Sequence, residues 1–247
     1  FFGLTYAVLF AVGPGLIALA GPSGLFLAHA AWMLGCALVL SRLMPADPPP
    51  PPVQRVGLLA QHVAIYTSPR IAAPAKGFVC YTITYVALLT LLPAMVEPGL
   101  GQALGVGMPL VSIAASLSLG VWLLGRRPAV QVVQAGFAAA MLAGLALWLV
   151  WGAGIGVVLA GWAVAGSLGL VQGASFAAIP QLNAAPADRA GASGAIAQLG
   201  NLGTTTGTPL LAMLIAMGGA TGVALLVLVF SGLGIVIHAI QARRRLS

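Results

Sequence analysis

The chain has 247 residues, of which 60% are hydrophobic and only 5% are charged. An ordinary soluble domain carries about 25% charged residues, and three acidic and ten basic side chains could not cover the surface of one this long. This composition excludes an ordinary soluble protein, and we expect the apolar surplus to face lipid.

Apolar runs of the length of a membrane span follow one another along the chain. Crossing ~30 Å of hydrocarbon takes roughly 20 apolar residues in a helix, and lipid-facing backbone must satisfy its own hydrogen bonds. The sequence therefore predicts an all-α, polytopic membrane protein with about eight transmembrane helices. Their expected ranges are Leu4 to Ala20, Ser23 to Leu40, Gly77 to Val96, Val106 to Leu124, Ala129 to Val150, Gly154 to Ala178, Gly191 to Met217 and Val223 to Ile240.

The basic residues fall in alternate connections between these helices. They are Arg42, Arg55, Arg70 and Lys76 after the second run, Arg126 and Arg127 after the fourth, Arg189 after the sixth, and Arg243, Arg244 and Arg245 at the end. The other connections, around Gly21, Glu97, Trp151 and Gly218, contain no Lys or Arg. Cytoplasmic loops collect Lys and Arg, so we expect a multi-pass protein of the cell (inner) membrane with both termini cytoplasmic. Since the basic clusters are separate groups at the membrane edge, the expected partner is the lipid bilayer and not a nucleic acid.

Three segments follow from this order of runs. Residues 1–43 are expected to form two transmembrane helices, residues 44–76 a cytoplasmic Pro-rich linker, and residues 77–247 a six-helix transmembrane bundle. Because Phe1 is not an initiator methionine and no basic stretch precedes the first apolar run, we expect the chain to be part of a longer one.

The linker combines an extended stretch with a short amphipathic one. The prolines from Pro48 to Pro52 have fixed φ angles and no amide donors, which predicts a stiff polyproline-like strap. Apolar residues then recur at helical spacing, which predicts a short helix lying in the membrane interface. These residues are Val56, Leu59, Val63 and Tyr66.

Small residues recur at every fourth position of the sixth expected helix. This spacing removes side-chain bulk along one stripe and lets a neighbouring helix approach closely. We interpret the stripe as a helix-packing seam, along which one group of helices could also rock against another. Its members are Gly161, Ala165, Gly169 and Gly173.

The seventh expected helix carries polar residues on one face and glycines on a neighbouring face. The polar residues are Gln198, Asn201, Thr205 and Thr208, and the glycines, expected to pack against another helix, are Gly200, Gly203 and Gly207. Two interpretations stay open: the amides bond to neighbouring helices, or they line a substrate cavity. Both require partners for the carboxamides, so we expect the Gln198/Asn201 face to point into the bundle.

Other candidates for a substrate cavity lie in the third and sixth expected helices. Tyr81 and Tyr85 are four residues apart and share a helical face, and Gln172 is a polar residue within an apolar run. Such side chains can stack on a solute and hydrogen-bond to it, or they can be ordinary buried residues with backbone partners.

The sequence offers little for enzymatic or metal chemistry. Its acidic residues are Asp47, Glu97 and Asp188, all in expected loops or edges, while His29 and His238 belong to different helices. Enzymes in membranes use paired carboxylates, His clusters or an activated nucleophile. We therefore expect neither an enzyme nor a cofactor or metal site.

Three stretches resemble a known family in order, spacing and sidedness. Gly125-Arg126-Arg127-Pro128 is similar to the Gly-Arg-Arg turn of the major facilitator superfamily, which lies between the second and third helices of each half. The stretch from Asp188 to Pro209 resembles the family's penultimate helix, in which an Arg-Gly entrance precedes Asn-x-Gly-x-x-x-Gly-x-Pro. The chain would then match helices five to twelve. Gly13-Pro14-Gly15 resembles the Gly-Pro motif of the fifth helix, although Leu16-Ile17 stand where further glycines are usual.

The resemblance implies two six-helix bundles that rock about a site at the membrane midplane. The runs that begin at Gly77 and Gly154 would line its cavity, and Gly125, Arg126 and Arg127 would form a conformational-switch loop. The expected function is secondary active transport of a small solute by alternating access. Proton coupling stays open, with its carboxylate expected elsewhere in the longer chain. The alternatives are a membrane-embedded enzyme and a non-transporting structural subunit of a membrane complex.

Overall fold

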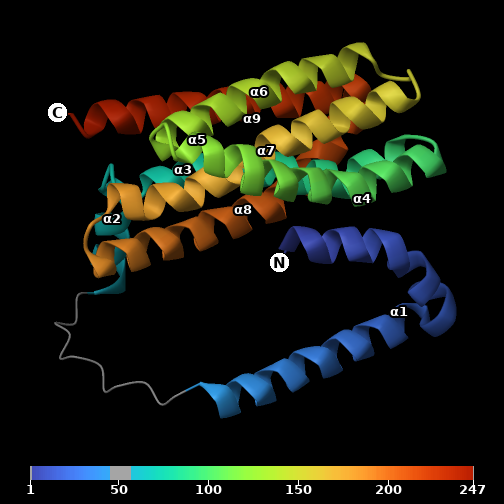
Figure 1. Ribbon diagram of the computed structural model, residues 1–247, viewed down its shortest axis with the longest axis horizontal. Helices are drawn as coiled ribbons and strands as arrows, with labels where there is room; N and C mark the ends of the chain where they lie inside the picture. Colours follow the sequence, from blue (N-terminus) through green and yellow to red (C-terminus); the bar gives the residue numbers. More distant parts are fainter. Residues whose placement is uncertain (1, 45–56, 247) are drawn as a thin grey trace.

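The computed structural model describes residues 2–44 and 57–246, and every regular element in these ranges is helical (Figure 1). The elements are α1 (Phe2–Leu43), α2 (Leu58–Thr67), α3 (Ala73–Leu91), η1 (Leu92–Met95), α4 (Pro98–Ala115), the π-helical turn η2 (Ser116–Gly120), α5 (Val121–Leu124), α6 (Ala129–Leu149), α7 (Ile155–Leu182), α8 (Pro186–Gly218) and α9 (Ala220–Arg244). The expected strap from Pro48 to Pro52, together with Asp47, Arg55 and Val56, lies outside the described residues.

α1 consists of two helical halves joined by a sharp bend at Gly21. This residue has φ 67° and ψ 170°, a combination that is essentially restricted to glycine. Pro22 follows, and a residue that precedes proline is disfavoured from helical geometry. The chain turns back at the bend (Figure 1), so the two halves correspond to the first two expected helices.

Six described helical stretches are long and apolar enough to cross a membrane, and the chain is accordingly a multi-pass membrane protein. α1 counts as one of the six, over Ala7–Leu43, although it contains the bend. α8 has 33 residues but is not among the six, because Gln, Asn, Thr and Gly occupy much of its middle. These two helices account for the difference from the expected eight, and the eight-span topology stays a prediction.

The helices from α3 to α9 form one bundle with buried apolar side chains between them. α3 packs on both α8 and α9, which also contact each other, and α7 packs on both α4 and α6. Phe137 of α6 and Leu168 of α7 are fully buried in this core. α1 reaches the bundle at α4, where the ring of Phe10 lies against Gly105. Large apolar side chains of α1, such as that of Phe26, are otherwise exposed, as expected for a surface that faces lipid.

The connections between the helices lie at the two ends of this bundle. In Figure 1, α2, the start of α3, the end of α5, the turn between α7 and α8 and the C-terminus share one end, and the turns before α4, α7 and α9 share the other. The first group carries Arg70, Lys76, Arg126, Arg127, Arg189, Arg243, Arg244 and Arg245, and the second carries Glu97. The basic residues of the bundle therefore gather at one end, whose assignment to the cytoplasm stays a prediction.

Candidate functional site

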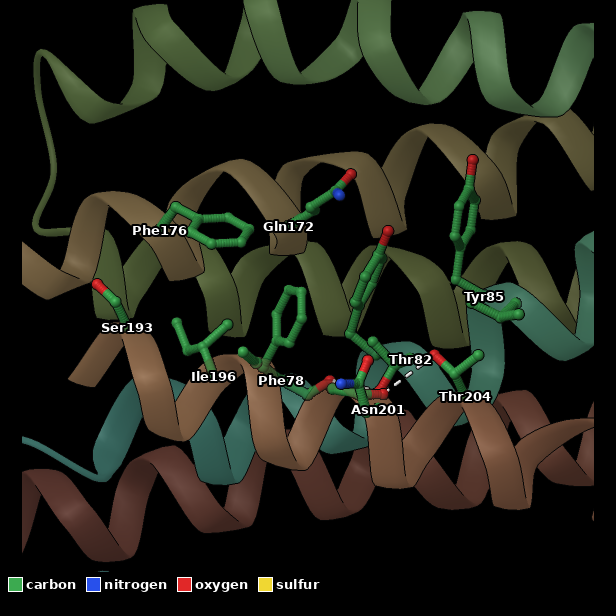
Figure 2. A pocket seen from close by; sticks show the side chains of 13 residues that line it. Phe78, Thr82, Tyr85, Gln172, Phe176, Ser193, Ile196, Asn201 and Thr204 are labelled. Atoms are coloured by element: carbon green, nitrogen blue, oxygen red, sulfur yellow. Dashed lines mark hydrogen bonds between the residues drawn. The ribbon is translucent and has the colours of Figure 1, made fainter. Parts of the chain in front are cut away.

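A cavity of about 240 Å³ lies between α3, α7 and α8. Figure 2 shows side chains from these helices converging on it. At ~1.5 Å per residue, Asn201 lies roughly 20 Å or more from either end of α8, which places the cavity near mid-bundle. The lining residues are Phe78, Tyr81, Thr82, Tyr85, Val86, Gln172, Phe176, Ser193, Ile196, Ala197, Gly200, Asn201 and Thr204.

A row of aromatic rings forms one wall of the cavity. The ring centroid of Tyr81 lies 4.9 Å from that of Phe78 and 5.3 Å from that of Tyr85, and the tyrosine rings are stacked with 16° between their planes. Phe176 extends the row from α7 through an edge contact with Phe78 at 5.4 Å. Three of the four rings belong to α3, where spacings of three and four residues keep side chains on one face. The helix itself thus holds the row in place.

Besides hydroxyl groups, two carboxamides line the cavity, Gln172 on α7 and Asn201 on α8 (Figure 2). Within the described parts of the chain, neither side-chain amide has a hydrogen-bond partner. The hydroxyls beside them are engaged locally: Thr204 donates to the carbonyl of Gly200 at 3.0 Å, and Thr82 donates to that of Phe78 at 3.2 Å. A carboxamide offers donors and an acceptor without net charge, so these two amides are available to a bound molecule.

The cavity wall is uncharged. None of the described residues that line it is an Asp, Glu, Lys, Arg or His. Asp188, the acidic residue in the first turn of α8, lines a separate crevice beside α2. An ion held against this wall would therefore lack a counter-charge from it, and such an arrangement is unfavourable in an apolar surrounding.

The structure brings four of the sequence candidates together and leaves two apart. Tyr81, Tyr85, Gln172 and Asn201 all line the cavity. Gln198 is exposed at the edge of α8, where its Oε1 accepts a hydrogen bond of 2.7 Å from the hydroxyl of Tyr66 on α2. Thr205 is also exposed and donates to the carbonyl of Asn201 at 2.9 Å.

The Gln198/Asn201 face is divided between the cavity and α2. The glycines of α8 pack against α3, and this contact sets the rotation of α8 about its own axis. Asn201 then borders the cavity on its open side, and Gln198, three residues earlier, faces α2. Both side chains are exposed in the described structure, Asn201 at the cavity and Gln198 beside α2, and the prediction that this face points into the bundle stays a prediction.

Several lining residues were not among the sequence candidates. Phe78 precedes Tyr81 by three positions, and Phe176 follows Gln172 by four, so helical spacing from the candidates already found would have indicated both. Ser193 and Thr204 had no comparable signal, because hydroxyl residues in membrane helices commonly bond to their own backbone, as both do here.

The two glycine stripes pack against different helices. Gly161 and Gly169 of α7 lie against α4, Gly173 lies against Ser116 of η2, and Ala165 between them is fully buried. A Cβ atom on Gly169 would lie 2.8 Å from Oγ of Ser112. In α8, Gly200, Gly203 and Gly207 lie against α3. Both stripes are therefore sites of close helix contact, and they hold two walls of the cavity against their neighbours.

The Gly125-Arg126-Arg127 turn ends the rod formed by α4, η2 and α5. The amides of Arg126 and Arg127 both donate to the carbonyl of Leu123, at 2.9 and 2.8 Å. The guanidinium of Arg126 lies 4.1 Å from the ring centroid of Trp122 and donates to the Trp122 carbonyl at 3.1 Å. The arginine side chain thus covers the end of its own helix, while its role in a conformational switch stays a prediction.

α2 is fastened to the bundle at both α8 and α9. Besides the bond from Tyr66 to Gln198, Arg244 donates to the carbonyl of Thr67 at 3.3 Å and Arg245 to that of Pro69 at 3.1 Å. Burial raises the pKa of Tyr66 above its ordinary value of 10.0. The phenol is therefore protonated at neutral pH and remains the donor to Gln198.

Comparisons with protein-family models, with curated proteins and with solved structures found no match. Among residues 2–44 and 57–246, no group of three or more His, Cys, Asp or Glu side chains could hold a metal ion. The description of the site therefore depends on the geometry of the cavity between α3, α7 and α8.

Proposed function

We propose that the chain forms part of a secondary transporter of the major facilitator type, which moves a small solute across the membrane by alternating access. The observation that carries this proposal is the cavity near mid-bundle with its two unengaged carboxamides. Polar groups at membrane depth are unfavourable unless a partner or an aqueous path meets them. A passing solute and its water would meet this need for Gln172 and Asn201.

The helix packing around the cavity supports this proposal. Alternating access requires a wall that moves as a unit while the contacts inside it persist. The glycine stripes hold α7 on α4 and α8 on α3 at close range, so each of these two pairs of helices can move as a unit. The resemblance of the Gly125 to Pro128 turn and of the Asp188 to Pro209 stretch to the family's motifs supports the same assignment.

Reconstitution of the full-length protein into proteoliposomes tests the proposal. A panel of labelled solutes is screened for saturable uptake that accelerates when the same unlabelled solute is present on the far side. We expect Asn201→Leu to lower this uptake, because the substitution removes a cavity amide. Leu202→Ala is the matched control, since Leu202 is exposed on the same helix and does not line the cavity.

Two results would contradict the proposal. One is uptake no faster than in protein-free liposomes for the whole panel, with folded and inserted protein. The other is a pair of identical uptake rates for the Asn201→Leu and Leu202→Ala variants.

A further inference from the structure

From the cavity wall we infer the class of solute: α3, α7 and α8 bind an uncharged planar ring that lies against the aromatic row and is hydrogen-bonded at its edge by the carboxamides of Gln172 and Asn201. This inference deepens the proposed function and depends on it for the claim that the bound molecule is carried. The binding itself is argued from the wall alone.

The shape of the wall favours a flat ring. Phe78, Tyr81 and Tyr85 present neighbouring rings from one rigid helix, and Phe176 adds a fourth ring at an angle of 71° to Phe78. Aromatic rings attract a further ring in offset or edge-to-face geometry. A saturated ring of the same size gains only the burial of its apolar surface, so the wall distinguishes aromatic from saturated solutes.

The volume of the cavity is sufficient for one ring. An apolar cavity of roughly 150 Å³ holds one benzene molecule. The cavity between α3, α7 and α8 measures about 240 Å³, which leaves space for a single six-membered ring and a small polar substituent. That substituent would meet the amides of Gln172 and Asn201, which can both donate and accept.

The charge of the wall favours a neutral solute over an organic cation or a carboxylate. Aromatic faces also attract cations, but the described lining residues include no carboxylate that would neutralise one. No lysine, arginine or histidine among them would pair with an anion. Both charged classes would be left unpaired against this wall, whereas a neutral polar ring finds matching groups at its face and at its edge.

Four probes of similar size separate these possibilities by charge and by ring type. Nicotinamide is an uncharged aromatic amide, nicotinate is an anion, 1-methylnicotinamide is a cation, and cyclohexanecarboxamide has a saturated ring. Binding is read in membranes containing the full-length protein with Cys36→Ser and Ser193→Cys. The thiol at position 193 lies at the cavity, and occupancy slows its alkylation by a maleimide.

We expect nicotinamide to protect the thiol from alkylation. Cyclohexanecarboxamide should bind up to about tenfold more weakly, because it loses one or two aromatic contacts. Nicotinate and 1-methylnicotinamide should protect less than nicotinamide. Tyr81→Leu should abolish the preference for the aromatic ring. Gln172→Glu should shift the preference toward the cation, because the new carboxylate supplies the missing counter-charge.

Better protection by either charged probe, equal protection by the saturated ring, or no protection by any of the four overturns the inference. Gel filtration of each variant confirms that it is folded. Protection by nicotinamide together with absence of any solute uptake would leave the binding class standing and remove the proposed transport. Uptake restricted to charged or saturated solutes would leave the proposed transport standing and remove the inferred binding class.

Discussion

The contact between α8 and α3 allows a quantitative prediction about stability. A Cβ atom on Gly207 would lie 2.8 Å from Cα of Ile83 and 2.9 Å from its carbonyl carbon, so the obstacle is backbone that cannot rotate away. On Gly200 the nearest atom would be Cε1 of Phe78 at 3.2 Å, which belongs to a movable ring. A Cβ atom on Gly194 would meet nothing within 4 Å. These three glycines of one helix form a graded series.

Two terms decide the effect of replacing each glycine by alanine. Alanine favours a helix over glycine by about 0.5–1 kcal/mol, and this gain is shared by the whole series. Overpacking a close contact costs about 1–3 kcal/mol. Because the shared term cancels, the free energy of unfolding of Gly207→Ala should lie about 1–3 kcal/mol below that of Gly194→Ala. Gly200→Ala should fall between them.

The free energies are measured by titrating the purified full-length variants in lipid-detergent micelles with sodium dodecyl sulfate and following helix content. Gly194→Ala controls for the change of glycine to alanine itself. If Gly207→Ala is as stable as Gly194→Ala, the close packing of α8 on α3 is refuted. A Gly200→Ala variant less stable than Gly207→Ala would refute the distinction between movable and fixed neighbours.

Three further predictions concern α2, the topology and α1. Tyr66→Phe should lower the free energy of unfolding by at most about 1 kcal/mol, because the hydrogen bond from Tyr66 to Gln198 is exposed. The same variant should raise the rate of amide hydrogen exchange in α2. Unchanged exchange would show that this hydrogen bond does not hold α2 on the bundle. A membrane-impermeant maleimide should label Glu97→Cys and Arg126→Cys from opposite sides, and labelling from the same side contradicts the topology. A Phe10→Cys/Gly105→Cys pair should cross-link with a short bismaleimide in membranes, since the ring contacts that glycine; failure to do so would place α1 elsewhere.

The apolar runs predicted where helices lie more accurately than where they begin. α6, the fifth expected helix, starts at Ala129 as expected, because Pro128 precedes it. α8 starts at Pro186, five residues before the expected Gly191. The expected start was taken from the apolar run, and the first turn of α8 is polar and lies outside that run. A proline at the helix start and Asp188 in the first turn are signals of a helix N-terminus that hydropathy does not register. α9 likewise continues through Arg244, whose long side chain can reach beyond the apolar region.

The cavity could be anticipated in part, because helical spacing groups residues on one helix but does not orient that helix. Tyr81 and Tyr85 were predicted to share a face, and their stacking follows from it. The rotation of α8 about its own axis decides which of its side chains face α3 and α7 across the cavity. That rotation is set by contacts such as that of Gly207 with Ile83, which no spacing within α8 alone reveals.

α8 is too polar to be recognised as a membrane span, and its surroundings explain why this composition is tolerated. One face packs its glycines on α3, and another borders the cavity with Asn201. The remaining exposed face includes Gln198 and Thr205, for which acyl chains would be a poor surrounding. In the proposed transporter, this face meets water or the opposite bundle and not lipid.

This argument predicts a difference between two exposed positions at similar depth. A hydrophilic methanethiosulfonate reagent should modify Thr205→Cys on α8, because water reaches that face during transport. Leu233→Cys on α9 is the matched control: Leu233 is 45% exposed on an apolar surface, and a lipid-facing thiol stays protonated and unreactive. Equal rates at the two positions would mean that both faces have the same surroundings. The exposed polar face of α8 would then need an explanation other than an aqueous path.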